Sequence, residues 1–172
     1  NTNTSTGTDP SLTYANDGDY DVRLIATSDK NCVDTVVNTI TVYPTPDVSI
    51  SATEECKNDT TDFTNSSTIS SGSFSNAWTL GDGNSSTDSD PSHVYASDGT
   101  YSVKLISTSA TNNCVDSASI SVTVNPLPTA SFTATNMCFG DTLRPVNTST
   151  GASSYSWDFD DGNSSTAASP EH

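Results

Sequence analysis

The sequence predicts an all-β protein made of tandem β-sandwich domains. Apolar residues alternate with polar ones over short stretches, as at Tyr20, Val22 and Leu24, whose side chains share one face of an extended strand. Turn-forming Gly, Asn, Asp and Pro residues separate these stretches. Short strands with one apolar face bury that face when two antiparallel sheets stack, so we expect a sandwich.

An internal repeat of about 82 residues divides the chain. Cys32 recurs as Cys114, and Cys56 recurs as Cys138, in both cases 82 positions later. The linker prolines follow the same spacing, and an aromatic strand followed by the turn D-G-N-S-S-T occurs twice. The sequence is therefore interpreted as an array of equivalent domains.

The repeat defines three segments with different completeness. Residues 1–44 correspond to the back half of a repeat, residues 45–126 to a whole repeat, and residues 127–172 to the front half of another. Both ends cut through a repeat, so we expect similar repeats to continue in both directions. Because each domain of such an array contacts only its neighbours, we expect the domains to be arranged as a rod.

The composition is strongly acidic. Five Lys and Arg residues stand against 21 Asp and Glu residues, which gives a net charge of −16. This charge repels phosphate backbones and anionic lipids, so we expect no nucleic-acid partner and no direct membrane contact. The abundance of Ser, Thr and Asn is also typical of disordered stalks, but the regular apolar alternation argues against disorder.

Three motifs carry a family resemblance. They are W-D-F-D-D-G at residues 157–162, P-S-H-V-Y at residues 91–95 and G-T-Y-S-V at residues 99–103. As a set they resemble the W-D-F-G-D-G, P-x-H-x-Y and G-x-Y-x-V signatures of PKD domains. Thr79, Leu80 and Asp160 depart from these signatures, but no core aromatic residue is lost.

The resemblance implies an Ig-like sandwich of about seven strands in each repeat. Trp78 and Trp157 are then expected between the two sheets. Tyr20 and Tyr101 each follow a glycine by two residues, and this placement resembles the tyrosine corner at the start of the penultimate strand.

The two histidines argue against catalysis. His93 and His172 occupy equivalent positions of the repeat, each in a P-x-H segment that the family uses structurally. One histidine per repeat cannot assemble a Ser-His-Asp or Cys-His constellation unless distant parts converge, so we predict that the protein is not an enzyme. The acidic run of Asp158, Asp160 and Asp161 could supply a carboxylate pair for sugar hydrolysis. A turn rich in aspartate is more often a solvated hairpin.

Calcium is the one cofactor that the sequence leaves open. Some PKD domains bind calcium, and Asp82, Asp160 and Asp161 supply carboxylate oxygens in turns. The dense D-x-D-x-D spacing of a specific calcium loop is missing, so these three residues are weak candidates.

The cysteines are candidates for disulfides in an extracellular protein. No C-x-x-C spacing that would indicate a thiolate metal site occurs among Cys32, Cys56, Cys114 and Cys138. A bond within one domain would join Cys56 to Cys114 and contribute roughly 4 kcal/mol in the chain-entropy model. Ig topology places these two residues at opposite poles, which favours a bond between neighbouring domains. The sequence leaves both pairings open.

Asp-Ser/Thr-apolar tripeptides mark four candidate modification sites. They resemble the O-glycosylation consensus of gliding Gram-negative bacteria that use type IX secretion. The candidate acceptors are Thr35, Thr60, Ser117 and Thr142. Chance matches are a real alternative in a chain so rich in Ser and Thr.

These observations favour a structural role. We expect the repeat region of a large adhesin or filament at the cell surface, outside the cell, of the type IX secreted and gliding-associated kind. The expected partners are neighbouring repeats of the same chain, and surface glycans or other cells. The alternative is an accessory spacer or carbohydrate-binding PKD module of a secreted hydrolase.

Overall fold

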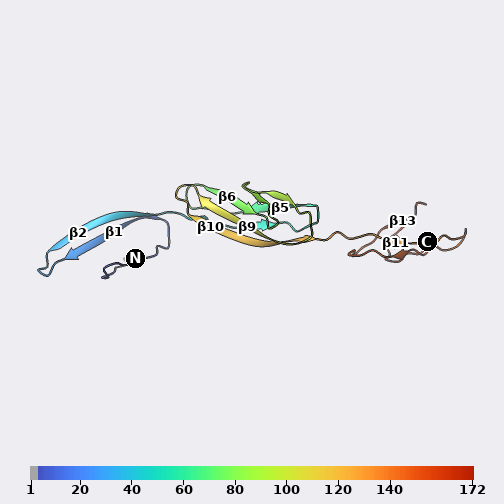
Figure 1. Cartoon of the computed structure of the whole chain (residues 1–172), viewed down its shortest axis with the longest axis horizontal. Helices are drawn as coiled ribbons and strands as arrows, with labels where there is room; N and C mark the ends of the chain where they lie inside the picture. Colours follow the sequence, from blue (N-terminus) through green and yellow to red (C-terminus); the bar gives the residue numbers. More distant parts are fainter. Residues whose placement is uncertain (1–3) are drawn as a thin grey trace. The chain divides into compact units, whose positions relative to one another are not determined.

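The computed structural model describes residues 4–172, and all regular secondary structure in this range is β-strand (Figure 1). The prediction of an all-β protein is confirmed. Among the described residues, no helix is long and apolar enough to cross a membrane.

The chain forms two compact units. The first contains residues 4–52, 63–91 and 102–120, and the second contains residues 53–62, 92–101 and 121–172. Three strands contribute residues to both units: β5 (Thr60–Asn65), β9 (Gly99–Ser109) and β10 (Val115–Asn125).

The first unit begins with a long antiparallel hairpin. Strand β1 (Gly18–Thr27) pairs with β2 (Val33–Val42) along its whole length (Figure 1). Asn31 closes the hairpin at a φ of 60°, in the left-handed region that asparagine tolerates better than most residues. Alternation places Tyr20, Val22 and Leu24 on one face of this hairpin, as the sequence predicts.

Residues 45–126, here called the central repeat, form two sheets. One has the strand order β3-β5-β8, and the other has the order β4-β10-β9-β6-β7. The remaining strands are β3 (Ile50–Ala52), β4 (Glu55–Cys56), β6 (Phe74–Thr79), β7 (Ser85–Ser86) and β8 (Ser92–Val94). The pairs β3–β5, β5–β8, β6–β7 and β6–β9 are antiparallel. Strands β4 and β10 run parallel at the end of β10.

The two sheets pack face to face around an aromatic pair. Phe63 of β5 lies against Trp78 of β6, with ring centroids 5.7 Å apart. Trp78 is 1% exposed, and its cross-strand partner Leu105 on β9 is fully buried. Burial of side chains of this size stabilises the fold by roughly 1.5–3 kcal/mol each, so this cluster is a main source of stability.

The second unit contains its own aromatic cluster. Tyr95 is buried and stacks on Tyr101, with ring centroids 4.1 Å apart. This unit also includes residues 127–172, here called the trailing segment, which form four short strands in two antiparallel pairs. The strands are β11 (Phe132–Thr133), β12 (Val146–Asn147), β13 (Trp157–Asp158) and β14 (Ser164–Ser165).

One glycine of the central repeat allows a close backbone contact. Gly81 has a φ of +86°, and a Cβ atom at this position would lie 2.8 Å from the carbonyl oxygen of Ser102. Only glycine fits between these two backbone segments without a shift. The equivalent residue of the trailing segment is Asp160, which keeps a positive φ of 60°.

Candidate functional site

The repeated aromatic turn is the most conspicuous local structure outside the core. Its strand carries a tryptophan whose indole donates a hydrogen bond to a backbone carbonyl ten residues later. Trp78 Nε1 lies 3.0 Å from Asp88 O, and Trp157 Nε1 lies 2.9 Å from Ala167 O. Trp78 is buried, whereas Trp157 is only half-buried.

The acidic residue of this turn is fixed by an asparagine two positions later. The backbone N–H and the side-chain amide of Asn84 donate to the two carboxylate oxygens of Asp82, and Asn163 does the same to Asp161. The turn therefore uses its carboxylate oxygens to hold its own backbone.

His172 adds a third contact to the turn of the trailing segment. Its Nε2 lies 2.8 Å from Asp161 Oδ2, and its ring stacks on Phe159 with centroids 4.2 Å apart. Its backbone pairs in both directions with Leu143. The hydrogen bonds from the Asn163 backbone and side chain, followed by that from His172, hold the pKa of Asp161 below its ordinary value of 3.8.

The other histidine has an aromatic neighbour as well. His93 on β8 pairs with Thr61 in the register of the three-stranded sheet, and its ring meets the ring of Tyr95 edge-on at 4.6 Å. His93 thus lies in a sheet, and His172 is held by backbone hydrogen bonds to Leu143, which lies outside the strands. Such placement suits a structural role, and the absence of enzyme activity stays a prediction.

The carboxylates do not form a ready cation site. Within residues 4–172, no group of three or more His, Cys, Asp or Glu side chains is placed to hold a metal ion. The Asp160 N–H donates to Asp158 Oδ1, so this part of the acidic run closes the turn. Calcium binding through Asp82, Asp160 or Asp161 therefore stays a prediction without a preassembled ligand set.

The tyrosines that follow a glycine make the same contact in both repeats. Tyr101 Oη donates to the carbonyl of Ser97 at 2.8 Å, and Tyr20 Oη donates to the carbonyl of Asn16 at 2.9 Å. A bond from this tyrosine to the backbone a few residues upstream is the defining contact of a tyrosine corner.

Sequence reasoning overlooked Tyr14. Its ring lies against Tyr20 with centroids 4.0 Å apart, as Tyr95 lies against Tyr101. Residues 10–14 read P-S-L-T-Y, so Tyr14 ends a variant of the P-x-H-x-Y motif in which Leu12 replaces the histidine. The sequence signal that could have identified Tyr14 is this motif with any residue allowed at the histidine position.

The four cysteines lie in the described part of the chain, and all four are free. Cys114 immediately precedes the eleven-residue strand β10, whereas Cys56 pairs beside Asn125, the last residue of that strand. A strand of this length extends roughly 35 Å, far beyond the Cα separation of about 4–7 Å in a disulfide. Pairing of Cys56 with Cys114 inside the central repeat is therefore excluded by geometry, and pairing between different repeats stays a prediction.

The candidate glycosylation sites are all accessible. Thr35, Thr60, Ser117 and Thr142 are exposed. Thr35 lies opposite Ile25 on the hairpin, on the face that does not carry Leu24. Exposure is necessary for modification, so the O-glycosylation hypothesis keeps all four sites.

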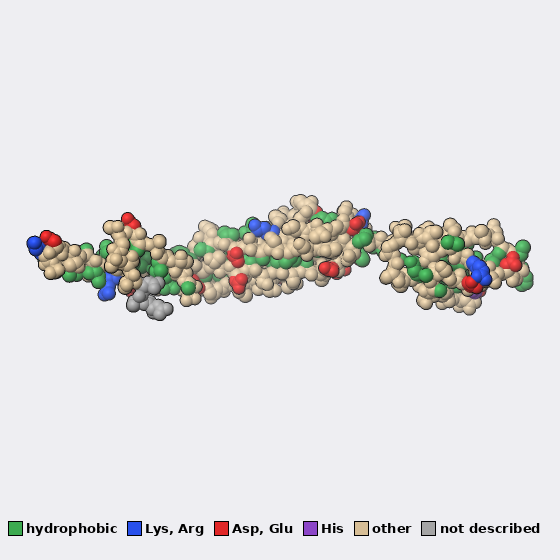
Figure 2. All heavy atoms as spheres, turned by 90° about the horizontal axis from the view of Figure 1, so that it is seen from below, with side chains coloured by type: hydrophobic (Ala, Val, Ile, Leu, Met, Phe, Trp, Pro, Cys, Tyr) green, Lys and Arg blue, Asp and Glu red, His purple; other side chains and the backbone are tan. Residues whose placement is uncertain are grey.

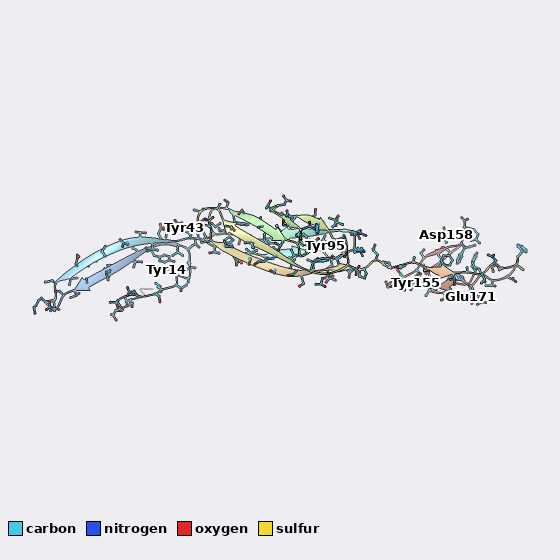
Figure 3. All side chains as sticks on the ribbon, viewed as in Figure 1. Tyr14, Tyr43, Tyr95, Tyr155, Asp158 and Glu171 are labelled. Carbon is cyan, nitrogen blue, oxygen red and sulfur yellow. The ribbon has the colours of Figure 1, made fainter. Side chains whose placement is uncertain are left out.

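The trailing segment carries an open aromatic groove of about 470 Å³. Phe132, Tyr155 and Trp157 line it together with polar residues such as Asn147, and Tyr155 is labelled in Figure 3. Phe132 and Trp157 meet edge-on at 5.2 Å, so the groove is a partly formed core.

Charged side chains do not gather into a basic surface on the face seen in Figure 2, where the few Lys and Arg residues are scattered. The absence of a nucleic-acid partner stays a prediction that rests on the net charge of −16.

Comparison with known proteins gives a family match and several structural similarities. Residues 41–124 match the family model described as PKD domain. The crystal structure of the PKD1 domain of Vibrio anguillarum Epp is 23% identical, with a TM-score of 0.45, over 48% of this chain and 96% of that chain. The PKD1 domain of the Vibrio cholerae metalloprotease PrtV is 26% identical, with a TM-score of 0.43, over 49% of this chain and 99% of that chain.

A structure of carbohydrate-binding modules from the β-sandwich superfamily is 21% identical, with a TM-score of 0.45. This similarity covers 61% of this chain and 48% of that one. No curated protein matches the chain. A PKD domain is thus recognised in residues 41–124, the range that also contains the motifs around Trp78, His93 and Tyr101.

Proposed function

We propose that this chain is a structural repeat region of a large extracellular adhesin or filament at the cell surface. The observation that carries the proposal is the recurrence of the same contacts at equivalent positions. The tyrosine corner, the tryptophan hydrogen bond and the Asp-Asn turn each occur twice. Equivalent domains built in series are suited to extending a chain and presenting many weak contacts.

The surface chemistry supports the same role. A net charge of −16 makes separate copies repel one another and keeps extended chains from sticking along their sides. Proline-containing linkers, at residues 43–46 and 125–128, restrict the backbone between consecutive repeats. In this proposal the repeats contact one another in series, and the exposed surface meets glycans or other cells.

The alternative role is an accessory module beside the catalytic domain of a secreted hydrolase. Antibodies raised against residues 45–126 distinguish the two roles on intact cells. The adhesin proposal predicts labelled fibres that remain attached to the cell surface. Recovery of the antigen mainly in the medium, in one polypeptide with hydrolase activity, would support the accessory role instead.

Modification of the native protein is tested separately by mass spectrometry. If the type IX and gliding context is right, peptides of the native protein should carry sugar at Thr35, Thr60, Ser117 and Thr142. The same chain expressed in a host without this glycosylation pathway is the control. Unmodified native peptides covering all four sites would remove the glycosylation hypothesis and leave the fold untouched.

A further inference from the structure

Asp-Gly dipeptides occur at four positions of the chain, which begin at Asp17, Asp82, Asp98 and Asp161. Glycine has no side chain to hinder its own backbone nitrogen, so this nitrogen can approach the carboxyl carbon of a preceding aspartate. The four carboxylates differ in how firmly the structure holds them. This difference decides which of the dipeptides can rearrange.

Two of the four carboxylates are clamped in the aromatic turns. The oxygens of Asp82 accept hydrogen bonds from Asn84, at 3.0 Å from its backbone N–H and 2.9 Å from its side-chain amide. Asn163 holds Asp161 in the same way, at 3.0 and 3.1 Å, and His172 adds a contact of 2.8 Å. These bonds fix the orientation of each carboxyl group and stabilise its charged form.

Asp98 has no such restraint. It lies directly before β9, and both Asp98 and Gly99 are exposed. Within residues 4–172, no group donates a hydrogen bond to the Asp98 carboxylate, whereas the equivalent Asp17 accepts one from the hydroxyl of Ser70. Gly99 has a φ of +146°, and a Cβ atom at this position would have nothing within 4 Å. The space around this peptide bond is open, so the carboxyl group of Asp98 has room to turn toward the nitrogen of Gly99.

We propose that Asp98–Gly99 is a site of spontaneous isomerisation to isoaspartate, and that the clamped Asp-Gly turns are protected from this reaction. The site lies in the central repeat, in which both sheets are complete. The proposal is independent of the role of the protein at the cell surface.

The reaction consumes no reactant other than water. The backbone nitrogen of Gly99 attacks Cγ of the protonated Asp98 carboxyl group, and an N–Cγ bond forms. One water leaves, made of the carboxyl hydroxyl and the amide proton, and the product is a five-membered succinimide ring. Water then opens the ring at either carbonyl. Opening at the main-chain carbonyl gives isoaspartate, whose backbone runs through Cβ and Cγ and whose α-carboxylate is free.

The clamps oppose this reaction in two ways. A carboxylate is a poorer electrophile than the protonated acid, and hydrogen bonds to the charged form keep the carboxyl group ionised. In the trailing segment, such bonds hold the pKa of Asp161 below its ordinary value. The bonds must also break before the carboxyl group can rotate toward the glycine nitrogen.

Isomerisation at Asp98 would act on the tyrosine corner. Tyr101 Oη donates to the carbonyl of Ser97, so Asp98 and Gly99 lie inside the loop that this hydrogen bond closes. Isoaspartate adds one atom to the backbone of this loop and places a free carboxylate beside it. The corner contact and the first residues of β9 should therefore loosen, and the central repeat should lose stability as the protein ages.

The test is site-by-site peptide mapping of residues 1–172 during incubation at neutral pH. Mass spectrometry identifies the isoaspartate peptides, and enzymatic methylation of isoaspartate gives an independent readout. Isoaspartate at Asp98 should accumulate at least about ten-fold faster than at Asp82 or Asp161, because hydrogen bonds to the carboxylate restrain the latter two.

Two variants examine the reactive site and the clamp separately. Asp98→Glu keeps the exposed charge but disfavours ring closure, so this variant should keep its melting temperature during incubation while that of the parent chain falls. Asn84→Ala removes the side-chain bond to Asp82 and keeps the backbone one, so isomerisation at Asp82 should rise roughly two- to five-fold, without a change at Asp98.

Three results would overturn the proposal. The first is an equal rate of isomerisation at Asp98 and Asp82 in the folded chain. The second is an intact Asp98 after a time in which a peptide of residues 95–103, which sets the intrinsic rate, has isomerised. The third is an Asn84→Ala variant in which isomerisation at Asp82 is no faster, which would remove the protective role of the clamp.

Discussion

Leu105 and Leu24 occupy the same position of the repeat, yet one is fully buried and the other is mostly exposed. Trp78 and Trp157 differ in the same direction, from buried to half-buried. In the central repeat both sheets are present, whereas residues 4–44 and the trailing segment each correspond to one part of the sandwich. Burial at these positions therefore depends on strands that are distant in sequence.

Hydrogen bonds between residues close in sequence do not depend on these distant strands. Tyr20 and Tyr101 make the same contact to the backbone four residues upstream, although only Tyr101 belongs to a complete repeat. The indole bonds of Trp78 and Trp157 likewise match within 0.1 Å. Short-range sequence thus specifies turns and corners, and the second sheet adds the core.

The sharpest test of this comparison is the tryptophan pair. Trp78→Ala should destabilise the central repeat by roughly 3–5 kcal/mol, because it removes a buried aromatic side chain and leaves a cavity. Trp157→Ala should cost only about 1 kcal/mol, since its side chain is only half-buried. Urea denaturation of the two variants measures both effects, and equal losses would contradict the distinction between covered and uncovered segments.

A smaller difference is expected at Gly81 and Asp160. Gly81→Ala should destabilise the central repeat by roughly 1–3 kcal/mol, because the new Cβ meets the Ser102 backbone at a positive φ. Asp160→Ala should change thermal unfolding of the central repeat very little, because Asp160 lies outside that repeat. A Gly81→Ala variant that melts like the parent protein would show that β9 can move away from the turn.

The hydrogen bond of the tyrosine corner should contribute less to the stability of the central repeat than Trp78 or Gly81. Tyr101→Phe removes one hydrogen bond and should lower the unfolding free energy by about 1 kcal/mol. Tyr20→Phe is the matched change in the hairpin, and it should leave the melting temperature of the central repeat unchanged. Differential scanning calorimetry distinguishes the two, and an equal shift in both variants would link the hairpin to the central fold.

The smallest effect concerns the pKa of Asp161. Its pKa is lowered in the folded turn, so the carboxylate stabilises the turn above its unfolded pKa, and this contribution is lost as the pH falls through the folded pKa. Asn163→Ala removes the side-chain hydrogen bond but keeps the backbone one, so it should raise the pKa of Asp161 only part of the way toward 3.8. His172→Ala removes the imidazole contact and should also raise this pKa. NMR titration of the Asp161 carboxyl carbon checks both shifts, and an unchanged pKa in both variants would contradict the role of these two side chains.

Several features of the fold could be predicted because they depend on local pattern. Alternating apolar residues indicated the faces of β1, β9 and β10, and the D-G-N-S-S-T sequence indicated both turns. The separation of Cys56 and Cys114 could not be predicted from local pattern, because it depends on which residue of β10 pairs with Cys56. The contact of Gly81 with Ser102 is also non-local, so it could not be predicted from the sequence.

The parallel pairing of β4 with the end of β10 has a consequence for a chain under tension. Strand β4 follows β3 in the first part of the central repeat, and it pairs beside the end of β10, where the chain leaves this repeat. When the two ends are pulled apart, parallel neighbours slide along each other, so their hydrogen bonds, together with that from Lys57 N to Asn125 O, bear the load at the same time. Forced unfolding is governed by the unfolding rate, so we expect this short parallel pair to act as a shear clamp for the central repeat.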